Sequence, residues 1–231
     1  MPLTQTVDDD ILTLTLDQGK VNALDMAFFA DLNQALDASD AAGVVVTGRD
    51  GVLSAGLDMG VMGSDDREAI AEMLIVFGET MLRLWLEPRP VVVAATGHAV
   101  AGGTVLCLAS DHAVAAEGDY RWGLVETTIG YPLPAWIIGL AGARVAPPHL
   151  QRLLLPGQAV GPAQAVDVGF ADELVPPDQV RARAHARAVE LCALPRRAYA
   201  DTKRRFRRAT AARLADDIAV DVGWALDAVG R

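Results

Sequence analysis

Two glycine-containing turns, set about fifty residues apart, constrain the fold of this chain more than any other feature of its sequence. The first, SAGLD at 54–58, follows the β-branched run at 44–47, and the second, VAGGT at 100–104, follows the run at 91–93. A strand that passes through such a turn into a helix points backbone N–H groups at whatever lies above the turn. Glycine also lets the backbone approach a ligand closely. Two such turns side by side would supply a pair of donors for one developing oxyanion.

Length and composition indicate a folded globular chain. It has 231 residues, of which 52% are hydrophobic and 22% charged, so one large domain is expected, and two small domains would also fit. The acidic start at residues 8–10 is unlike a secretory signal, and no apolar stretch reaches membrane-spanning length. Cys107 and Cys192 have no metal-ligand spacing, so we expect small buried hydrophobes in a reducing compartment. These features predict a cytoplasmic protein that does not contact membranes.

The charge is acidic overall but unevenly distributed. A net charge of −10 argues against nucleic-acid binding, which relies on Lys and Arg to neutralise phosphates. Basic residues crowd one late segment, between residues 196 and 208. That segment fits either a solvated helix face or a local site for a phosphorylated ligand.

Hydrophobic periodicity predicts alternating strands and helices. Strands are expected at 11–16, 44–47, 91–95 and 112–116, and helices around 28–36, at 68–85 and at 102–109. The long helix should stop before Pro88 and Pro90. From Pro134 onward the pattern is mainly helical, and the Ala- and Arg-rich tail could pack on the body or on a neighbouring subunit. We therefore expect one α/β body with a helical C-terminal extension.

Several well-known catalytic motifs are absent. The chain has no GxxxxGK[ST], GxGxxG, GxSxG or HExxH segment, which weakens nucleotidase, dehydrogenase, serine-hydrolase and zinc-protease interpretations. Its four histidines are scattered without metal-ligand spacing, so no metal site is expected. His98 is kept as a reserve candidate because it lies close to the second glycine turn.

Five segments, taken together, carry a resemblance. They are VVVTG at 44–48, LSAGLDM at 53–59, the group RPV, TGHA and AGG between 89 and 103, GLVET at 123–127, and AVDVGFADELV at 165–175. In order and approximate spacing they resemble the crotonase (enoyl-CoA hydratase/isomerase) superfamily, over about residues 21–203. The resemblance implies a spiral of ββα repeats at 1–190 and a helical trimerisation region at 191–231. It also implies an acyl-CoA substrate, a homotrimer or dimer of trimers, and no metal or redox cofactor.

The same resemblance implies roles for particular residues. The two oxyanion donors of the family fall on the backbone N–H groups of Leu57 and Gly102. The path of the CoA thioester and pantetheine would be lined by Lys20, Ala23, Ala55, Gly56, Asp58, Met59 and Gly103. The late basic segment would suit the CoA phosphates, without assignment to individual residues.

One departure from the family pattern bears on the reaction. Hydratases of the family carry two catalytic glutamates, and the first of these positions is Val105 here, while the second is Glu126. The valine side chain can neither accept nor donate a proton, so this chain lacks one of the two carboxylates that activate water in hydratases. The chain looks more like the delta3-delta2-enoyl-CoA isomerases of the family, which use one glutamate at the second position. We therefore expect an isomerase with Glu126 as its acid/base.

The chemistry of double-bond migration supports an isomerase, although other functions stay open. Moving a double bond from C3 to C2 requires one proton to leave C2 and one to arrive at C4, which a single carboxylate can do in turn. The apolar neighbours of Glu126 should raise its proton affinity. The rivals are a hydratase or hydrolase that uses a group such as His98, and a non-catalytic acyl-CoA-binding protein.

Other residues near the motifs have less specific interpretations. Asp58 is expected to cap a helix rather than to catalyse. Trp136, with Tyr131, Pro132 and Pro134, could shape an acyl pocket or pack in the core. Thr104 could place a hydroxyl near the site.

Overall fold

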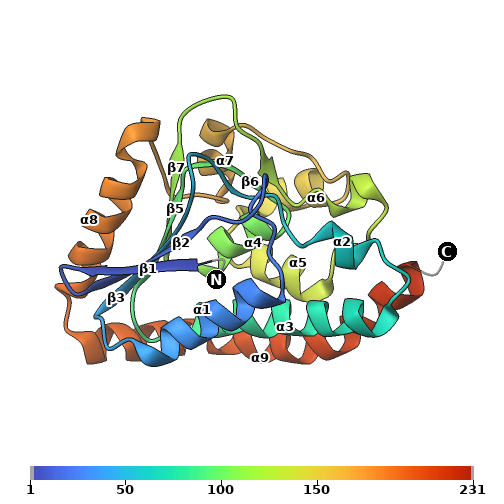
Figure 1. Ribbon diagram of the computed structural model, residues 1–231, viewed down its shortest axis with the longest axis horizontal. Coiled ribbons are helices and arrows are strands. Elements are labelled where there is room, and N and C mark those ends of the chain that lie inside the picture. The colour runs from blue at the N-terminus through green and yellow to red at the C-terminus, as the bar shows by residue number, and fades with distance from the viewer. Residues whose placement is uncertain (1–2, 230–231) are drawn as a thin grey trace.

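The computed structural model describes residues 3–229 of the chain, with side chains to residue 223. Two sheets form its framework (Figure 1). The larger sheet has the order β1-β2-β3-β5-β7-β9, and all its pairings are parallel except that of β1 with β2. The smaller sheet has the order β4-β6-β8 and is parallel throughout. The fold is therefore mixed α/β, as the sequence predicts.

The elements have the following bounds in chain order. The strands are β1 (Leu3–Asp8), β2 (Ile11–Leu16), β3 (Gly43–Gly48), β4 (Gly51–Ser54), β5 (Val91–Ala95), β6 (Gly97–Val100), β7 (His112–Ala116), β8 (Trp122–Gly123) and β9 (Glu173–Val175). The helices are α1 (Met26–Ala38), α2 (Met59–Met62), α3 (Arg67–Leu86), α4 (Gly102–Ala109), the 3₁₀ turn η1 (Glu126–Ile129), α5 (Ala135–Gly142), α6 (Pro147–Leu154), α7 (Pro162–Val168), the 3₁₀ turn η2 (Pro177–Gln179), α8 (Val180–Cys192) and α9 (Arg196–Val229).

The order of the elements is a repeating ββα spiral. A strand of the large sheet is followed at once by a strand of the small sheet and then by a helix, as in β3-β4-α2 and β5-β6-α4. The next turn of the spiral is β7-β8-η1. Because each small-sheet strand runs directly into a helical segment, the helix N-termini gather along one edge of that sheet. This arrangement brings together segments that lie about fifty residues apart in sequence.

Local sequence signals start and stop the helices. The side chains of Asp25, Asp58 and Asp66 each cap a helix by accepting a hydrogen bond from a backbone N–H of its first turn. The long helix α3 ends at Leu86, just before the two prolines that cannot continue it. Three of the acidic residues among the first eighty positions therefore serve as helix N-caps. As expected from the sequence, Asp58 has this role.

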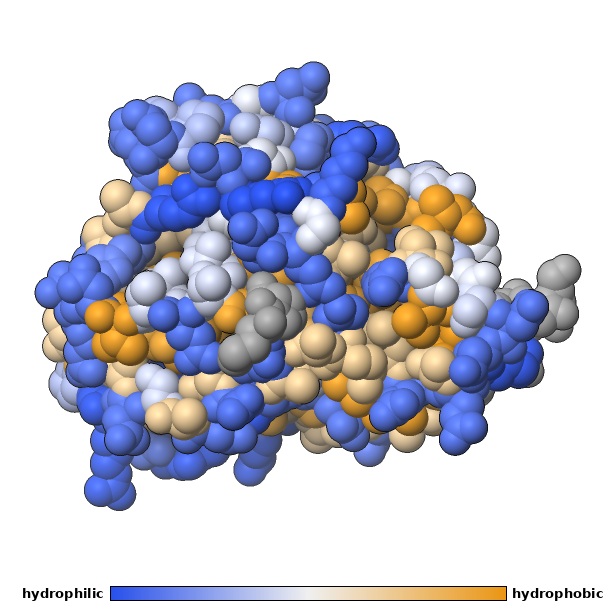
Figure 2. All heavy atoms as spheres, viewed as in Figure 1, coloured by the Kyte–Doolittle hydropathy of each residue, from blue (hydrophilic) through white to orange (hydrophobic). Residues whose placement is uncertain are grey.

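The face of the molecule drawn in Figure 2 is largely polar, but hydrophobic side chains gather on it in several places. One of these places lies toward the right of the view, over the part of the molecule that holds α2. Met59, at the start of α2, is 53% exposed, and Ile129 in η1 is 55% exposed. Large exposed apolar side chains on neighbouring elements mark a place where the protein can receive an apolar ligand or partner.

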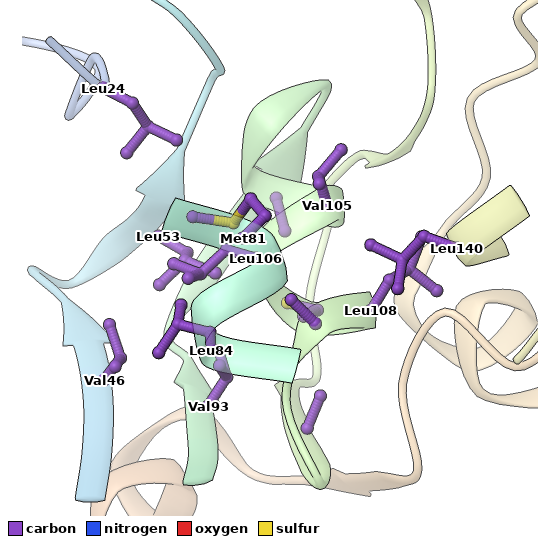
Figure 3. Packing of buried hydrophobic residues seen from close by; sticks show 14 of the residues in the cluster. Leu24, Val46, Leu53, Met81, Leu84, Val93, Val105, Leu106, Leu108 and Leu140 are labelled. Carbon is purple, nitrogen blue, oxygen red and sulfur yellow. The ribbon is translucent and has the colours of Figure 1, made fainter. Parts of the chain in front are cut away.

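The core is built around α4, which is buried along its whole length. Apart from Thr104, its side chains are apolar on all faces, as is typical of a helix that no solvent reaches. Figure 3 shows Val105, Leu106 and Leu108 of α4 among hydrophobic residues from the strands and from α3 and α5. This burial fixes the position of the α4 N-terminus, because moving the helix would expose much of the core.

The C-terminal helix α9 packs on its own chain. It lies along α3 and also contacts α5 (Figure 1). The contact includes charged groups, since Lys203 and Arg207 of α9 have side chains only 5% and 8% exposed and both pair with Asp111, at 2.6 and 3.0 Å. Asp111 also accepts a hydrogen bond from the N–H of Val91, at 2.7 Å. One buried carboxylate thus joins α9 to the starts of β5 and β7.

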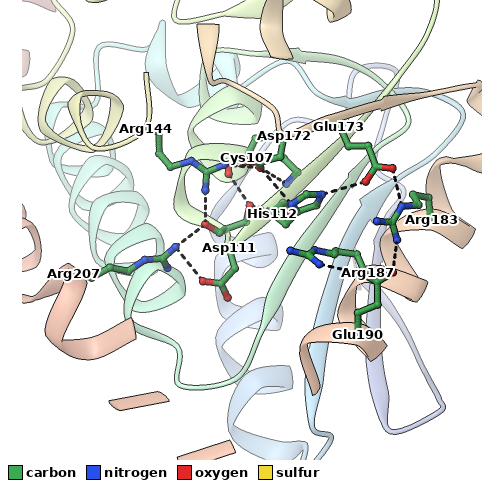
Figure 4. A network of polar contacts seen from close by, with 12 residues as sticks. Cys107, Asp111, His112, Arg144, Asp172, Glu173, Arg183, Arg187, Glu190 and Arg207 are labelled. Atoms are coloured by element: carbon green, nitrogen blue, oxygen red, sulfur yellow. Dashed lines mark hydrogen bonds and ion pairs between the residues drawn. The ribbon is translucent and has the colours of Figure 1, made fainter. Parts of the chain in front are cut away.

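A polar network continues from this carboxylate (Figure 4). Arg207 donates to the backbone oxygens of Ser110 and Trp85 and stacks over the Trp85 ring at 3.8 Å. Arg144 donates to the same Ser110 oxygen and pairs with Asp172 at 2.6 Å. Two of the late basic residues are therefore structural, and burial lowers the pKa of Lys203 to about 8, against the opposing effect of Asp111.

Candidate active site

The two glycine turns lie in contact with each other. Gly56 has φ +104°, and a Cβ placed on it would stand 2.9 Å from the Cβ of Ala101 and 3.2 Å from the N of Gly102. A Cβ on Gly102 would in turn stand 3.2 Å from the Cα of Gly56. The absence of side chains at these two positions is what allows the turns to meet. The pairing of turns expected from the sequence is thus confirmed.

The second turn is held in a strained conformation. Ala101 has φ +52°, in the left-handed region that residues with a Cβ rarely adopt. Its N–H donates to the oxygen of Gly123 at 2.8 Å, and Gly103 packs so closely that a Cβ there would lie 2.3 Å from the oxygen of Ser54. Because Gly102 is the first residue of α4, its N–H has no carbonyl of the helix to bond. Among the described residues this N–H has no acceptor, so the turn presents an unused donor at a helix N-terminus.

The first turn presents a similar donor. The residues on either side of Leu57 are bonded to Leu24, with Leu24 N to Gly56 O at 2.8 Å and Asp58 N to Leu24 O at 3.1 Å. Within the described residues, the N–H of Leu57 itself has no protein acceptor. It is directed away from Leu24, because successive peptide groups of extended backbone point in opposite directions.

A cavity of about 260 Å³ opens beside the two turns. It lies between the glycine turns, α2, α3, η1 and the start of α5. Its lining consists of Ala55, Leu57, Met59, Met62, Leu74, Phe77, Ala101, Gly102, Val125, Glu126, Ile129, Tyr131, Pro132, Pro134 and Ile137. Nearly all of these residues are apolar, as is usual for a small-molecule site.

Glu126 is the one charged side chain among these described lining residues. It stands at the first position of η1, directly after β8 and its short exit loop. Its Oε2 atom is buried and has no hydrogen-bond partner in the described part of the chain. Burial raises the pKa of the carboxyl to about 7, and a hydrogen bond from the backbone N–H of Glu126 opposes that shift. A carboxyl with one unpartnered oxygen in an apolar cavity, and with a pKa near neutrality, can both accept and return a proton.

The predicted site residues divide into two groups. Five line the cavity, namely Ala55, Leu57, Met59, Gly102 and Glu126. The others lie outside its lining, namely Lys20, Ala23, Gly56, Asp58 and Gly103. Gly56 and Gly103 allow close packing, and Asp58 caps α2 through the N–H of Gly60 at 2.8 Å. Lys20 is exposed at the neighbouring turn, and its backbone oxygen accepts a hydrogen bond from Arg49.

Three residues with open interpretations are not part of the cavity lining. His98 accepts the N–H of Arg121 on Nδ1 and packs edge-on against Tyr120. Thr104 is buried, and its hydroxyl donates to Ala99 O at 2.6 Å while accepting from Gly123 N, which ties β6 to β8. Trp136 is buried against Phe77, with ring centroids 5.1 Å apart. These side chains therefore pack or brace the structure instead of facing the cavity.

Val105 is likewise absent from the lining. It is completely buried in the hydrophobic core, on α4 below the second turn (Figure 3). The position at which the family resemblance places the first glutamate of hydratases is therefore a core position here, where an ionised side chain would lose its hydration.

Sequence reasoning missed part of the cavity wall. Met62, Leu74, Phe77 and Ile137 come from α2, α3 and α5. Their spacing follows the core-facing side of a helix, which is the same signal that ordinary core residues give. Tyr131, Pro132 and Pro134, which the sequence did indicate as candidates for the pocket, also line the cavity, and the Tyr131 hydroxyl donates to the oxygen of Met62 at 2.8 Å. Only the packing of these elements distinguishes the wall from the core.

One group of potential metal ligands occurs among the described residues. Atoms of Asp8, Asp9 and His185 lie within 4.8 Å of one another at the surface, and both aspartates are exposed. This group is distinct from the cavity, whose lining offers a single carboxylate and no histidine or cysteine. The cavity therefore has no set of residues suited to a metal. No helix in residues 3–229 is long and apolar enough to cross a membrane.

Comparison with known proteins extends these observations. The family model described as Enoyl-CoA hydratase/isomerase matches residues 6–227. The protein from Rattus norvegicus named enoyl-CoA delta isomerase 1, mitochondrial, is 31% identical over 212 residues, which cover 87% of this chain and 72% of the relative.

Solved structures agree in fold. An enoyl-CoA hydratase/isomerase family protein from Pseudomonas syringae has a TM-score of 0.94 and 32% identity, covering 97% of this chain and 98% of the other. The human mitochondrial delta3-delta2-enoyl-CoA isomerase has a TM-score of 0.94 and 28% identity, covering 100% and 93%. From the match over nearly its whole length, together with the ββα spiral, the chain belongs to the enoyl-CoA hydratase/isomerase family, the crotonases.

Proposed function

We propose that this protein is an isomerase that converts 3-enoyl-CoA to 2-enoyl-CoA, with Glu126 as its acid and base. The observation that carries the proposal is a carboxyl with one buried, unpartnered oxygen in an apolar cavity, beside two backbone N–H groups that have no acceptor among the described residues. The carboxylate removes a proton from C2 of the acyl chain. The electron pair then moves toward the thioester oxygen, and the C3–C4 double bond shifts as the same carboxyl returns the proton to C4.

The backbone N–H groups of Leu57 and Gly102 are proposed to hold the thioester oxygen as negative charge develops. Loss of one donor from such a hole typically raises the barrier by roughly 2.7–4 kcal/mol. Both donors belong to peptide units fixed by packing, because Leu57 is bracketed by bonds to Leu24 and Gly102 opens a buried helix. Fixed donors need little reorganisation during the reaction, which is the condition for effective charge stabilisation.

The environment of Glu126 suits a base that must also act as an acid. A pKa of about 7 means that the carboxylate and carboxylic acid forms are of similar energy near neutral pH. Hydration of a 2-enoyl-CoA would require a second group to handle water. The cavity lining of the described residues offers no second carboxylate, and Val105 is enclosed in the core. These facts favour the isomerase over the hydratase within the same family.

The cavity wall also indicates the kind of acyl chain. An apolar cavity of about 150 Å³ takes up one benzene molecule, so about 260 Å³ has room for roughly ten non-hydrogen atoms. The wall provides no charged partner for a polar acyl group beyond Glu126. We therefore propose an unsubstituted acyl chain of medium length as the substrate. The CoA portion would leave past the exposed side of α2, near Met59 and the turn that contains Lys20 and Ala23.

Other properties expected from the sequence complete the proposal. The protein is proposed to work without a metal or redox cofactor, because proton transfer and charge stabilisation are all that the reaction requires. Assembly into a homotrimer or dimer of trimers, and location in the cytoplasm, also stay predictions. The domain division at residue 190 falls inside α8 (Val180–Cys192).

The test offers the purified protein 3-enoyl-CoA and 2-enoyl-CoA thioesters of several chain lengths in separate assays. We expect isomerisation of the 3-enoyl substrate, with kcat/KM rising through a midpoint near pH 7 as Glu126 loses its proton. Glu126→Gln should lower the rate by about 10²–10⁴-fold. An exposed control, Glu79→Gln on α3, should leave it unchanged.

Two other results of these assays would support a different function. Efficient addition of water to the 2-enoyl substrate would establish a hydratase and refute the assignment of a single-carboxylate isomerase. Tight binding of acyl-CoA without turnover of any substrate in the panel would establish a binding protein.

A further inference from the structure

Asn22 is a fully buried polar residue in the loop between β2 and α1. Its Nδ2 lies 3.0 Å from the oxygen of Leu16 and 3.2 Å from the oxygens of both Val52 and Leu53. Its Oδ1 accepts the N–H of Gln18 at 2.9 Å. One side chain thus joins the end of β2, the loop that follows it and the end of β4.

The backbone of Asn22 is also unusual. Its φ is +50°, in the left-handed region that asparagine tolerates better than most residues with a side chain. The N–H of Asn22 donates to Gln18 O at 3.0 Å. The loop therefore reverses direction at Asn22, and the buried side-chain hydrogen bonds hold it in that conformation.

This conformation places residues 21–24 alongside residues 55–58. The hydrogen bonds between them are Ala55 N to Val21 O at 3.0 Å, Leu24 N to Gly56 O at 2.8 Å and Asp58 N to Leu24 O at 3.1 Å. These bonds bracket Leu57, whose own N–H is directed away from Leu24. The direction of that N–H therefore depends on a loop that Asn22 fixes in place.

We propose that Asn22 is a positioning residue for the Leu57 N–H, the first of the two oxyanion donors. It lies outside the cavity lining and acts through the loop at residues 21–24. The inference rests on the proposed function, in which the Leu57 N–H holds the thioester oxygen. Its physical basis is that a main-chain donor stabilises charge only when its direction is fixed before the reaction.

The experiment compares two variants at this position with a matched control. Asn22→Gly removes every side-chain hydrogen bond but permits the left-handed backbone without a steric penalty. Asn22→Asp keeps an acceptor for Gln18 and loses the donors. Asn33→Ala is the control, because Asn33 is the other asparagine of the chain and bonds to Thr80 and Arg83, away from the cavity.

We expect both Asn22 variants to lower kcat on 3-enoyl-CoA by roughly 10–100-fold, because a displacement of about 1 Å can have an effect of this size. KM should change by less than about threefold, because the contacts with the rest of the substrate remain. The midpoint of the pH profile should not move, since Glu126 is untouched. Asn33→Ala should retain the kcat of the unaltered protein.

Hydrogen exchange provides a readout that does not depend on activity. In the Asn22 variants the amides of Leu24, Ala55 and Asp58 should exchange at least tenfold faster, and in Asn33→Ala they should not. Unchanged kcat in the folded Asn22 variants, or a rise in KM alone, would overturn the inference and leave the proposed function intact. If the unaltered protein does not isomerise 3-enoyl-CoA, the proposed function fails. In that case the hydrogen-exchange rates decide whether Asn22 holds the turn that contains Leu57. If the amides of Leu24, Ala55 and Asp58 exchange equally fast in the Asn22 variants and the unaltered protein, the inference is overturned as well.

Discussion

Replacing Glu126 by glutamine is expected to stabilise the folded protein at alkaline pH while it greatly slows the proposed reaction. Burial raises the carboxyl pKa from its ordinary value of 4.5 to about 7, so the folded protein holds this proton more tightly than the unfolded chain does. Below pH 4.5 both states are protonated and no penalty exists. Between pH 4.5 and 7 the unfolded chain ionises first, and stability falls as the pH rises. Above pH 7 the full penalty applies.

The size of the effect follows from the same pKa. A tenfold change in proton affinity is worth about 1.4 kcal/mol, so the change from 4.5 to about 7 corresponds to about 3 kcal/mol. Glutamine has nearly the shape of the protonated carboxyl and cannot ionise. At pH 8.5 Glu126→Gln should therefore be more stable by about 3 kcal/mol, which raises Tm by roughly 6–12 °C for a chain of this length. At pH 4.5 the two proteins should unfold at nearly the same temperature.

Thermal unfolding monitored by circular dichroism from pH 4.5 to 8.5, at constant ionic strength, measures this difference. Glu79→Gln, which alters an exposed glutamate on α3, serves as the control and should leave the pH dependence unchanged. A Glu126→Gln variant that gains no stability between pH 5 and 8.5 would refute the reasoning, because the carboxylate would then have to be hydrated or paired. A gain in stability together with a loss of activity is the pattern expected when a residue that destabilises the fold is needed for function.

Three further predictions concern stability and the reaction. Asp111→Asn should destabilise the protein by about 3–5 kcal/mol in urea unfolding, because two buried cations of α9 lose their partner, and a loss below about 1 kcal/mol would contradict that role. Gly103→Ala should lower the free energy of unfolding by about 1–3 kcal/mol, because the added Cβ would stand 2.3 Å from the oxygen of Ser54. Gly142→Ala is the control and should cause no such loss, because the space around Gly142 is open. Equal Tm values for the two variants would refute the packing argument. Val105→Glu should destabilise the protein markedly without conferring hydration, and efficient water addition to 2-enoyl-CoA by this variant would show the argument to be wrong.

The elements that the sequence predicts well are those that local patterns define. The strand at 91–95 and the helix at 102–109 have the predicted bounds, and the long helix at 67–86 differs from the prediction by one residue at each end. Proline stops and runs of β-branched residues act over a few neighbouring positions, so the chain alone reveals them. The resemblance implied ββα repeats, but the residue pattern did not locate the strands of the small sheet, because β4, β6 and β8 have only two to four residues each. Such strands are too short for periodicity and are stabilised by pairing with distant segments.

The charged residues divide in the same way. The sequence locates a basic segment near residue 200, but its composition is compatible with either a solvated helix face or a phosphate site. The structure buries Lys203 and Arg207 against Asp111, about ninety residues earlier in the chain. Whether a charge faces water or a buried partner depends on which segments meet, and no local pattern records that.

The sequence by itself determined the order of strands and helices, the two glycine turns and the replacement of a carboxylate by Val105. Only the tertiary structure decided that Gly56 and Gly102 touch, that one carboxyl oxygen of Glu126 is buried without a partner among the described residues, and that side chains from α2, α3 and α5 enclose the cavity. The reason is physical. Glycine freedom and hydrophobic runs are properties of neighbouring residues, whereas desolvation, cavity shape and the direction of a main-chain donor are set by atoms from many separate parts of the chain.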